Sequence, residues 1–470
     1  MIPVEKFKLD TLSALKNKQL RSNFRLAMDG LIEKRREVFI DFDEFQNLRD
    51  LGHSIKKNAL SKLPDLLEKL EYNCKRNGIQ VHWAESTFDA NQIVLEIANR
   101  SEVKSVVKGK SMVSEEMGLN HFLQKRGIET LEADLGEYII QLDNELPSHI
   151  IMPAIHKNKD QISNVFFEKV DKTARAVAAE EMTSIARKVL RQKFFEADMG
   201  VSGVNFAVAE TGTICLVENE GNGRFCTTLP PLHVAVMGIE KVVESLTDVP
   251  PLLSLLTRSA TGQGITTYFN MINSPRRSYE KDGPKEVHLI LLDNGRSSMF
   301  KDQLLRETLF CIRCGACMNH CPVYSRIGGH AYNSTYPGPI GKIFTPQING
   351  LHESGYLTDA STLCGACVEV CPVKIPITEI LLRLRKDKLI YKSRLQRLEG
   401  MKASFFWKIW SIVFSSPSMY RLNSYIITKI IRFLPNCLSI THDWTLVRAM
   451  PQFSNKSLHQ IVNEKGLSEE

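Results

Sequence analysis

The spacing of apolar residues changes near residue 78 and again near residue 300. Before residue 78, apolar positions recur at helical spacing among many charges, as in ALSKLPDLLEKLEYNC. After it, short apolar runs such as IQVHWA and VKSVVKG alternate with amphipathic stretches such as TFDANQIVLEIANR. Strand, helix and strand in this order are typical of a parallel sheet with right-handed crossovers. The pattern predicts a helical region over 1–77 and an α/β domain over 78–297.

The same pattern predicts individual elements of the α/β domain. Further strands are expected at IETLEA, EYIIQL, SHIIMPAI, VNFAVAE, TICLVEN and EVHLILLDN. SEEMGLNHFLQKRG is expected to be one helix that Ser114 caps and Gly127 ends. The strands on either side of Glu210 and Gly212 are close enough to form a hairpin. We therefore expect a parallel or mixed sheet.

Two further regions follow residue 297, where the strand pattern fades. Residues 298–378 hold most of the cysteines, and residues 379–470 are predicted to be a basic, apolar, helical extension. The longest uncharged run of that extension, 409–420, contains Pro417 and is shorter than the roughly 20 residues that a membrane-spanning helix needs. We expect no transmembrane segment. The N-terminus contains acidic residues and no continuous apolar core, so we also expect no secretory signal and a cytoplasmic location.

The net charge of +7 is concentrated in the extension. Between Arg383 and Arg432, twelve Lys or Arg residues stand against two acidic ones. The sequence contains no recognised nucleic-acid-binding motif to accompany this charge, so we expect no nucleic-acid partner. The basic helix and the segment FFWKIW predict either peripheral contact with the inner face of a membrane or an interface with protein.

Seven of the eleven cysteines lie between residues 311 and 371, which indicates metal binding rather than disulfides. The first four, followed by proline, match the C-x2-C-x2-C-x3-C-P run of bacterial ferredoxins. The last three repeat the end of that run, with Ser361 where its first cysteine would fall. Crossing of ligands between the two runs predicts two [4Fe-4S] clusters. Cluster 1 takes Cys311, Cys314, Cys317 and Cys371, and cluster 2 takes Cys321, Cys364, Cys367 and a fourth ligand.

The sequence leaves the fourth ligand of cluster 2 open. Either the hydroxyl of Ser361 binds iron, or Cys437 or a partner's thiol does, or cluster 2 is a [3Fe-4S] form or keeps an open iron site. A further alternative is that Ser361 only begins a helix. Zinc is the alternative metal, although seven cysteines exceed what one tetrahedral site needs.

Several long motifs resemble the lactate utilization protein B family. They are VVKGKSMVSEEMGLN, PSHIIMPAIHKN and GVNFAVAETGTICLVENEGNGRFCTTLPPLHVAVMGIEK, followed by the cysteine segments and the basic tail. The resemblance implies an LUD domain, similar to sugar-phosphate isomerases and CoA-transferases, and then a helical ferredoxin-type di-cluster domain. It also implies a subunit of a system that oxidises L-lactate to pyruvate together with lactate utilization proteins A and C.

Pocket residues of the LUD domain rest on weaker signals. Relatives of this fold place an acidic catalyst near a loop, which makes Glu210 the candidate catalytic residue. The loop that contains Gly262 and Gly264 is a candidate phosphate cradle. The remaining pocket candidates are Lys108, Lys110 and His156.

The leading hypothesis is an iron–sulfur electron-transfer subunit in L-lactate oxidation. No complete G-x-G-x-x-G fingerprint follows a predicted strand, so chemistry at the alcohol carbon is expected to need a partner. Whether this chain is itself catalytic stays open. One alternative is an LUD-domain enzyme that acts on a CoA ester or a sugar phosphate, with accessory clusters. Another is an iron–sulfur redox sensor or scaffold.

Overall fold

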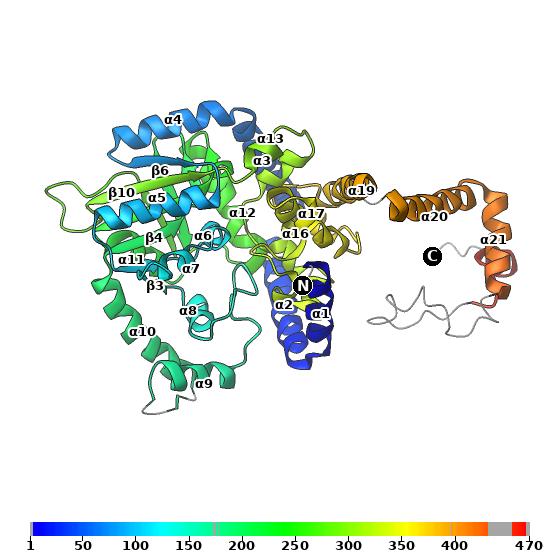
Figure 1. Ribbon diagram of the computed structural model, residues 1–470, viewed down its shortest axis with the longest axis horizontal. Coiled ribbons are helices and arrows are strands. Elements are labelled where there is room, and N and C mark those ends of the chain that lie inside the picture. The colour runs from blue at the N-terminus through cyan, green and yellow to red at the C-terminus, as the bar shows by residue number, and fades with distance from the viewer. Residues whose placement is uncertain (1–2, 173–174, 177, 396, 431–453, 467–470) are drawn as a thin grey trace. The chain divides into compact units, whose positions relative to one another are not determined.

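The computed structural model describes residues 3–172, 175–176, 178–395, 397–430 and 454–466. The chain divides into two compact units, Met1–Arg385 and Lys386–Glu470. The first unit begins with four helices, in agreement with the predicted helical region. They are α1 (Pro3–Lys16), α2 (Lys18–Val38), α3 (Phe42–Ser61) and α4 (Leu63–Arg76), drawn in blue in Figure 1.

A six-stranded parallel sheet forms the centre of the first unit and confirms the predicted α/β class. Its strand order is β1-β10-β7-β4-β2-β3. The strands are β1 (Gln80–Ala84), β2 (Ser105–Lys108), β3 (Glu129–Glu132), β4 (Met199–Gly203), β7 (Leu232–Gly238) and β10 (Glu286–Leu292). The two central strands β4 and β7 are buried along their whole length. Such strands carry continuous apolar runs because both faces of the sheet are covered.

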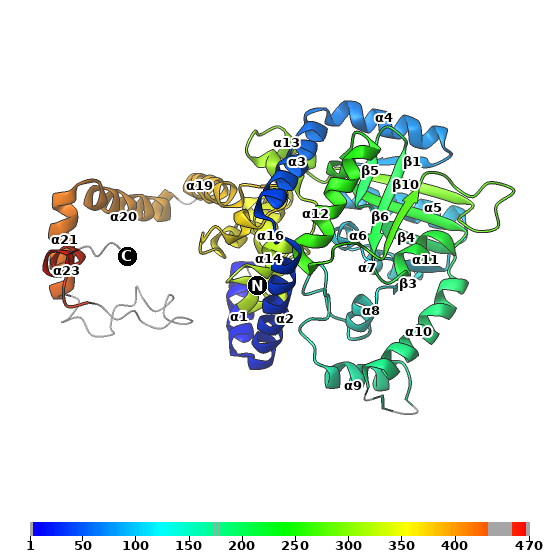
Figure 2. The same cartoon turned by 180° about the vertical axis from the view of Figure 1, so that it is seen from behind.

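A smaller sheet packs on one face of the large one (Figure 2). Its order is β8-β5-β6-β9, with β5 (Phe206–Val208), β6 (Thr213–Glu218), β8 (Val242–Val243) and β9 (Tyr268–Ile272). Ala235 and Met237 of β7 join the core shared with this sheet, whereas Val234 and Val236 join the core on the opposite face. This alternation is the period of two that a strand imposes on its side chains. The pair β5 and β6 is antiparallel, as the predicted hairpin requires.

Helices complete both faces of the sheets. They are α5 (Thr87–Arg100), α6 (Met112–Met117), α7 (Leu119–Gln124), α8 (Leu135–Leu142), α9 (Lys159–Lys169), α10 (Ala179–Glu196), α11 (Asn222–Thr228) and α12 (Val249–Thr261), with η1 (Ile239–Lys241) and η2 (Leu246–Asp248). Residues of α5, α6 and α7 share a core with the sheet face opposite the small sheet. The α12 helix contacts α2 and α3 and so joins the N-terminal helices to the α/β core.

Several predicted elements were wrong. EYIIQL is helix α8, capped by Asp134, and SHIIMPAI has no regular structure, because a short apolar run does not distinguish strand from helix. SEEMGLNHFLQKRG falls in two helices rather than one, because Gly118 takes a left-handed φ of 61° between them and Ser111 is the cap. Strands β4, β7, β8 and β9 were missed; LHVAVMG of β7, for example, is a short apolar run whose periodicity alone does not identify a strand.

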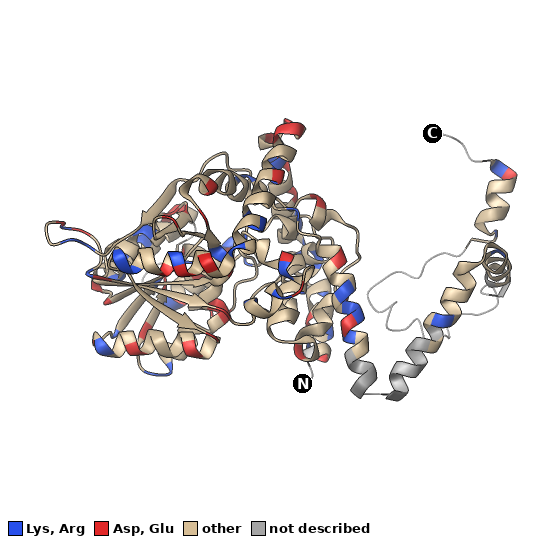
Figure 3. Ribbon diagram, turned by 90° about the horizontal axis from the view of Figure 1, so that it is seen from above, with Lys and Arg blue, Asp and Glu red and all other residues tan. Residues whose placement is uncertain are grey.

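The cysteine-rich region is built from short helices. These are α13 (Arg296–Phe300), η3 (Leu305–Phe310), α14 (Ala316–Asn319), α15 (Tyr324–Ile327), η4 (His330–Tyr332), α16 (Gly338–Ile348), α17 (Leu351–Ser354), η5 (Gly355–Asp359) and α18 (Ala366–Glu369), followed by α19 (Ile377–Leu395). The expected helical character of this region is therefore confirmed. Basic and acidic residues are interspersed along the ribbon of the first unit (Figure 3).

The second unit contains α20 (Arg397–Ser415), α21 (Pro417–Ile430) and α23 (Leu458–Lys465). The aromatic side chains of Trp410 and Phe414 stack with ring centroids 4.5 Å apart, and both are about half exposed. No helix among the described residues is long and apolar enough to cross a membrane. Cys437, which the sequence offered as a cluster ligand, lies outside the described residues.

The tight centre of the sheet gives a first test. A Cβ atom on Gly200 of β4 would lie 1.8 Å from the carbonyl oxygen of Cys226. Gly200→Ala should therefore lower the free energy of unfolding by about 3 kcal/mol or more, because backbone must move. Gly30, inside α2, has nothing within 4 Å of its Cβ position. Gly30→Ala is the control and should stabilise by about 0.5–1 kcal/mol. Equal denaturation midpoints for the two variants would contradict the packing described.

Candidate functional site

The first cysteine run is shaped by two residues with left-handed backbone. Arg313 has φ of 63° and Gly315 has φ of 86°, and these turns fold the chain around its own thiols before α14 begins. The backbone N–H of Arg313 donates to the Sγ of Cys311 at 3.4 Å, and that of Tyr324 donates to the Sγ of Cys321 at 3.4 Å. Backbone N–H donors of this kind stabilise thiolates, and they tune the reduction potential of a cluster that the thiolates bind.

The second run repeats this conformation with serine in place of the first cysteine. Leu363 and Gly365 have φ of 55° and 84°, and α18 then begins one residue later, as α14 does. The N–H of Leu363 donates to the Oγ of Ser361 at 3.2 Å, just as Arg313 donates to Cys311. The hydroxyl of Ser361 therefore lies in the position that the Cys311 thiol has in the first run.

The seven thiols line two separate cavities. The first has a volume of about 380 Å³, space open to solvent included, and the second about 290 Å³. Cys311, Cys314, Cys317 and Cys371 line the first, together with several Ile and Val side chains, and Cys321, Cys364, Cys367 and Ser361 line the second. These are the two crossed groups that the spacing predicts. Among the described residues, no three His, Cys, Asp or Glu side chains form a group suited to a single metal ion.

The donor set fits iron–sulfur clusters, since soft thiolate sulfur is the preferred ligand of iron–sulfide centres. Burial raises the pKa of Cys367 and of Cys371 to about 11, so these thiols need a nearby positive charge or a metal to become thiolates. Lys342, which is 1% exposed, provides one such charge, with its Nζ 3.5 Å from the Sγ of Cys321. Arg49 is another, and its Nε donates to the carbonyl of Cys371 at 2.9 Å.

A buried ion-pair network joins the cysteine region to the sheet. Arg296, fully buried, lies 2.9 Å from a carboxylate oxygen of Glu116 and 2.6 Å from one of Glu240. The hydroxyl of Tyr336 donates to Glu116 at 2.5 Å. Burial disfavours the charge on Glu240, but Arg296 and other nearby cations outweigh it and lower its pKa to about 2. The network therefore stays charged at neutral pH.

A large cavity lies at the carboxyl ends of β2, β4 and β7 and reaches the first cysteine run. It encloses about 1450 Å³, space open to solvent included. Its walls include Lys110 after β2, Gly203 at the end of β4 and Lys241 after β7, and also Arg313 and Cys314. In open α/β sheets this edge is the usual place for a ligand. The cavity and the first cysteine cavity share the residues Ile150, Arg313 and Cys314.

Of the two lysines that the sequence offered as pocket residues of the LUD domain, only one lines the large cavity. Lys110 lines the large cavity, 3.7 Å from Asp134, whereas Lys108 is buried beside Glu115 and Glu132 and does not line it. Burial opposes the charge on Lys108, yet its two carboxylate partners raise its pKa well above the ordinary value. Its role in the structure is to neutralise buried acids.

Glu210 and the two glycines also lie outside the cavity lining. A carboxylate oxygen of Glu210 accepts a hydrogen bond from the N–H of Leu246 at 3.3 Å, at the hairpin turn. Gly262 ends α12 with φ of 64°, and a Cβ there would lie 2.4 Å from the carbonyl oxygen of Lys34. Gly264 has nothing within 4 Å of its Cβ position. The lining residues of this loop are instead Thr261, Gln263 and Thr266.

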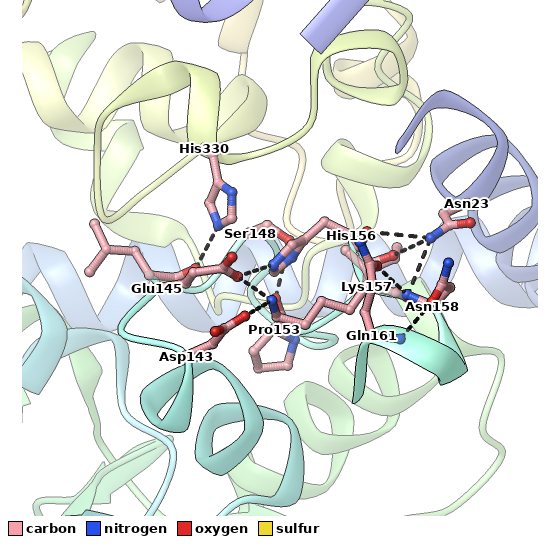
Figure 4. A network of polar contacts seen from close by, with 12 residues as sticks. Asn23, Asp143, Glu145, Ser148, Pro153, His156, Lys157, Asn158, Gln161 and His330 are labelled. Carbon is pink, nitrogen blue, oxygen red and sulfur yellow. Dashed lines mark hydrogen bonds and ion pairs between the residues drawn. The ribbon is translucent and has the colours of Figure 1, made fainter. Parts of the chain in front are cut away.

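His156 belongs to a network of hydrogen bonds within the loop after α8, and this network also connects the loop to α2 (Figure 4). Its Nε2 lies 2.5 Å from Glu145, and its Nδ1 lies 2.9 Å from the hydroxyl of Ser148. The Nδ2 of Asn23 in α2 donates to the carbonyl of Lys157 at 3.3 Å. His156 is therefore held in place by structural contacts and is not part of the large cavity lining.

The sequence analysis missed Lys241 and Arg313. Lys241 lies three residues after the buried run of β7, and charged residues just after such a run are the signal that could have indicated it. Arg313 stands between two cysteines of the ferredoxin run, and only the fold shows that it also lines the cavity of another domain.

Fold and site together define an iron–sulfur protein with an LUD domain. The family model for the LUD domain matches residues 67–292, and that for a 4Fe-4S dicluster domain matches residues 307–375. A third, for the C-terminal region of lactate utilisation protein B, matches residues 396–467. The chain belongs to the lactate utilization protein B family, since its relatives are similar over nearly their full length.

Three relatives illustrate this similarity. Lactate utilization protein B of Bacillus pumilus is 38% identical, with 100% of this chain and 99% of the relative covered. The protein of the same name from Bacillus subtilis is 40% identical, with 90% and 87% covered. A protein of Escherichia coli K12 named "uncharacterized electron transport protein YkgF" is 42% identical, with 98% of each chain covered.

The buried network gives a second test. Arg296→Met leaves the carboxylates of Glu116 and Glu240 buried without this cation, which should cost about 3–5 kcal/mol of unfolding free energy in chemical denaturation. Arg100→Met is the control, because the pair between Arg100 and Glu286 is about half exposed and should contribute less than about 1 kcal/mol. A cost for Arg296→Met as small as that of the control would show that the network is not structurally important.

Proposed function

We propose that this chain is the iron–sulfur electron-transfer subunit of a multi-protein system that oxidises L-lactate to pyruvate. The observation that carries the proposal is the pair of neighbouring cavities lined by the two crossed thiol groups. The names of the relatives, which refer to lactate utilization and to electron transport, supply the process. Iron–sulfur clusters supply the chemistry of single-electron transfer when they are bound.

The two groups of ligands differ in their contact with solvent. Cys314 and Cys371 of the first group are buried among apolar side chains, whereas Cys364 of the second group is exposed. The two groups are also close, since α14, which carries Cys317, packs against α18, which carries Cys367. This arrangement supports a relay from the buried cluster 1, next to the LUD domain, to cluster 2 at the surface.

Ser361 is proposed as the fourth ligand of cluster 2. The repeated backbone conformation supports this proposal, and Ser361 lines the second cavity with Cys364 and Cys367. The proposed ligands of cluster 1 are Cys311, Cys314, Cys317 and Cys371, and those of cluster 2 are Cys321, Cys364, Cys367 and Ser361.

Lactate utilization proteins A and C are the proposed partners, since a lactate-oxidising system of this kind needs a separate site for chemistry at the alcohol carbon. The exposed aromatic side chains of α20, including Phe405 and Trp410, are a proposed contact surface for partner protein. Binding to anionic vesicles that is lost at high salt would instead favour contact with the inner face of the membrane.

The cluster proposal is tested by iron and sulfide analysis with EPR of the anaerobic protein. Two [4Fe-4S] clusters require about eight irons per chain and two interacting signals after reduction by dithionite. About four irons or fewer after careful reconstitution would contradict the two-cluster assignment.

Ser361→Ala tests the fourth ligand. Loss of the hydroxyl should release one iron from cluster 2, leaving about seven irons and an oxidised three-iron EPR signal, whereas Ser361→Cys should retain about eight. Ser325→Ala is the control, because the exposed hydroxyl of Ser325 contacts only the carbonyl of Pro322 among described residues. A three-iron signal already present in the wild-type protein would exclude Ser361 as a ligand.

Lys342→Met tests the electrostatic environment of cluster 2. Removal of a buried cation next to Cys321 should make the reduction potential of cluster 2 more negative and leave that of cluster 1 almost unchanged, because a positive charge favours the added electron. Potentiometric titration followed by EPR measures both values. Lys301→Met, which removes an exposed charge, is the control, and an equal shift in the two variants would show that Lys342 has no specific effect.

A further inference from the structure

The large LUD cavity has a positively charged end next to the first cysteine run. Lys241 is 6% exposed, lines the cavity and makes no hydrogen bond or ion pair with any described residue. Burial lowers its pKa to about 8, and the nearby carboxylate of Glu240 offsets the effect of burial only in part. A buried ammonium with no partner is costly, so a ligand that brings a negative charge to it would be stabilised.

Arg313 adds a second cation at the same end. The central carbon of its guanidinium lies 4.1 Å from the ring centroid of Phe344 and 4.5 Å from that of Tyr336. Its Nη2 lies 3.7 Å from Glu240, but its buried Nη1 has no hydrogen-bond partner among the described residues. The two rings therefore hold in place a guanidinium that has one unsatisfied donor.

The cavity lining also includes three acidic side chains among apolar and neutral polar ones. These are Asp134, Glu218 and Glu220, and both carboxylate oxygens of Glu218 accept hydrogen bonds from the N–H groups of Gly223 and Arg224, at 2.7 Å and 2.6 Å. Near Asp134, Lys110 offers a further polar contact. A phosphate-bearing sugar or a CoA ester would place several negative charges against these acids, whereas a small monocarboxylate needs only the two cations at one end.

We propose that the cavity binds a small 2-hydroxy or 2-oxo carboxylate, whose carboxylate group pairs with Lys241 and Arg313 and lies next to Cys314. The choice of a 2-hydroxy or 2-oxo acid rests on the proposed function, whereas the carboxylate site rests on the cavity itself. The bound molecule is then adjacent to the first group of thiols, at the buried end of the proposed relay. Lys241 is a binding residue in this proposal, and no bond-making step is assigned to the site.

Calorimetric titration of the anaerobic, full-length holoprotein with L-lactate and with pyruvate tests the proposal. The wild-type protein should bind at least one of them, and Lys241→Met should weaken that binding by about tenfold or more, because a buried charge pair is lost. Lys241→Arg should retain most of the affinity. The control is Lys69→Met, which removes an exposed positive charge from α4 and should leave the affinity unchanged. EPR of the reduced protein should also show a ligand-dependent change in the signal of one cluster.

Each other outcome overturns the inference. Wild-type protein that binds neither acid excludes the site without any need for a variant. Binding that Lys241→Met does not weaken places the ligand elsewhere. Binding of a sugar phosphate or an acyl-CoA in place of the two acids would favour the enzyme alternative. If Lys241→Met changes only a reduction potential, Lys241 serves the cluster and not a ligand. Iron analysis separates these results from failure of the proposed function, since two clusters without ligand binding would leave the electron-transfer proposal standing.

Discussion

The junction between the LUD domain and the cysteine-rich region depends on the buried ion pairs of Arg296. Its guanidinium neutralises Glu116, from the helix after β2, and Glu240, from the short helix η1 that follows β7. Tyr336 and Phe344, from the cysteine-rich region, contact the same group of charges. Two carboxylates buried together are stable only when a cation lies between them, so the sheet edge and the cysteine region are held in one arrangement.

This arrangement explains why the large cavity and the first cysteine run share a wall. The carboxyl ends of β2, β4 and β7 form the usual ligand-binding edge of a parallel sheet. In this chain that edge is closed on one side by Arg313 and Cys314 instead of by another loop of the LUD domain. Only Ile150, Arg313 and Cys314, which line both cavities, would therefore stand between a ligand in the large cavity and the thiols of the first cysteine run.

The two cysteine runs share one local conformation in spite of the difference between Cys311 and Ser361. In each run a non-glycine residue with left-handed backbone, a glycine and a one-turn helix follow in the same order. Such a backbone is unfavourable for Arg313 and Leu363, and it persists only where the surroundings impose it. The second run keeps this backbone conformation around Ser361, which supports the proposal that Ser361 is a cluster ligand and does not only begin a helix.

The class of the fold could be predicted from the sequence because strand and helix periodicity is a local property, and ligand spacing predicted the same two groups of thiols that line the two cavities. Periodicity failed for the short apolar runs EYIIQL, SHIIMPAI and LHVAVMG, whose conformation depends on what covers them. Glu210, Lys108 and His156 looked equally plausible as pocket residues until their partners were seen. Only the tertiary structure decided that Lys241 and Arg313 meet at one cavity, because these residues are distant in sequence and are brought together by the packing of the cysteine region against the sheet edge.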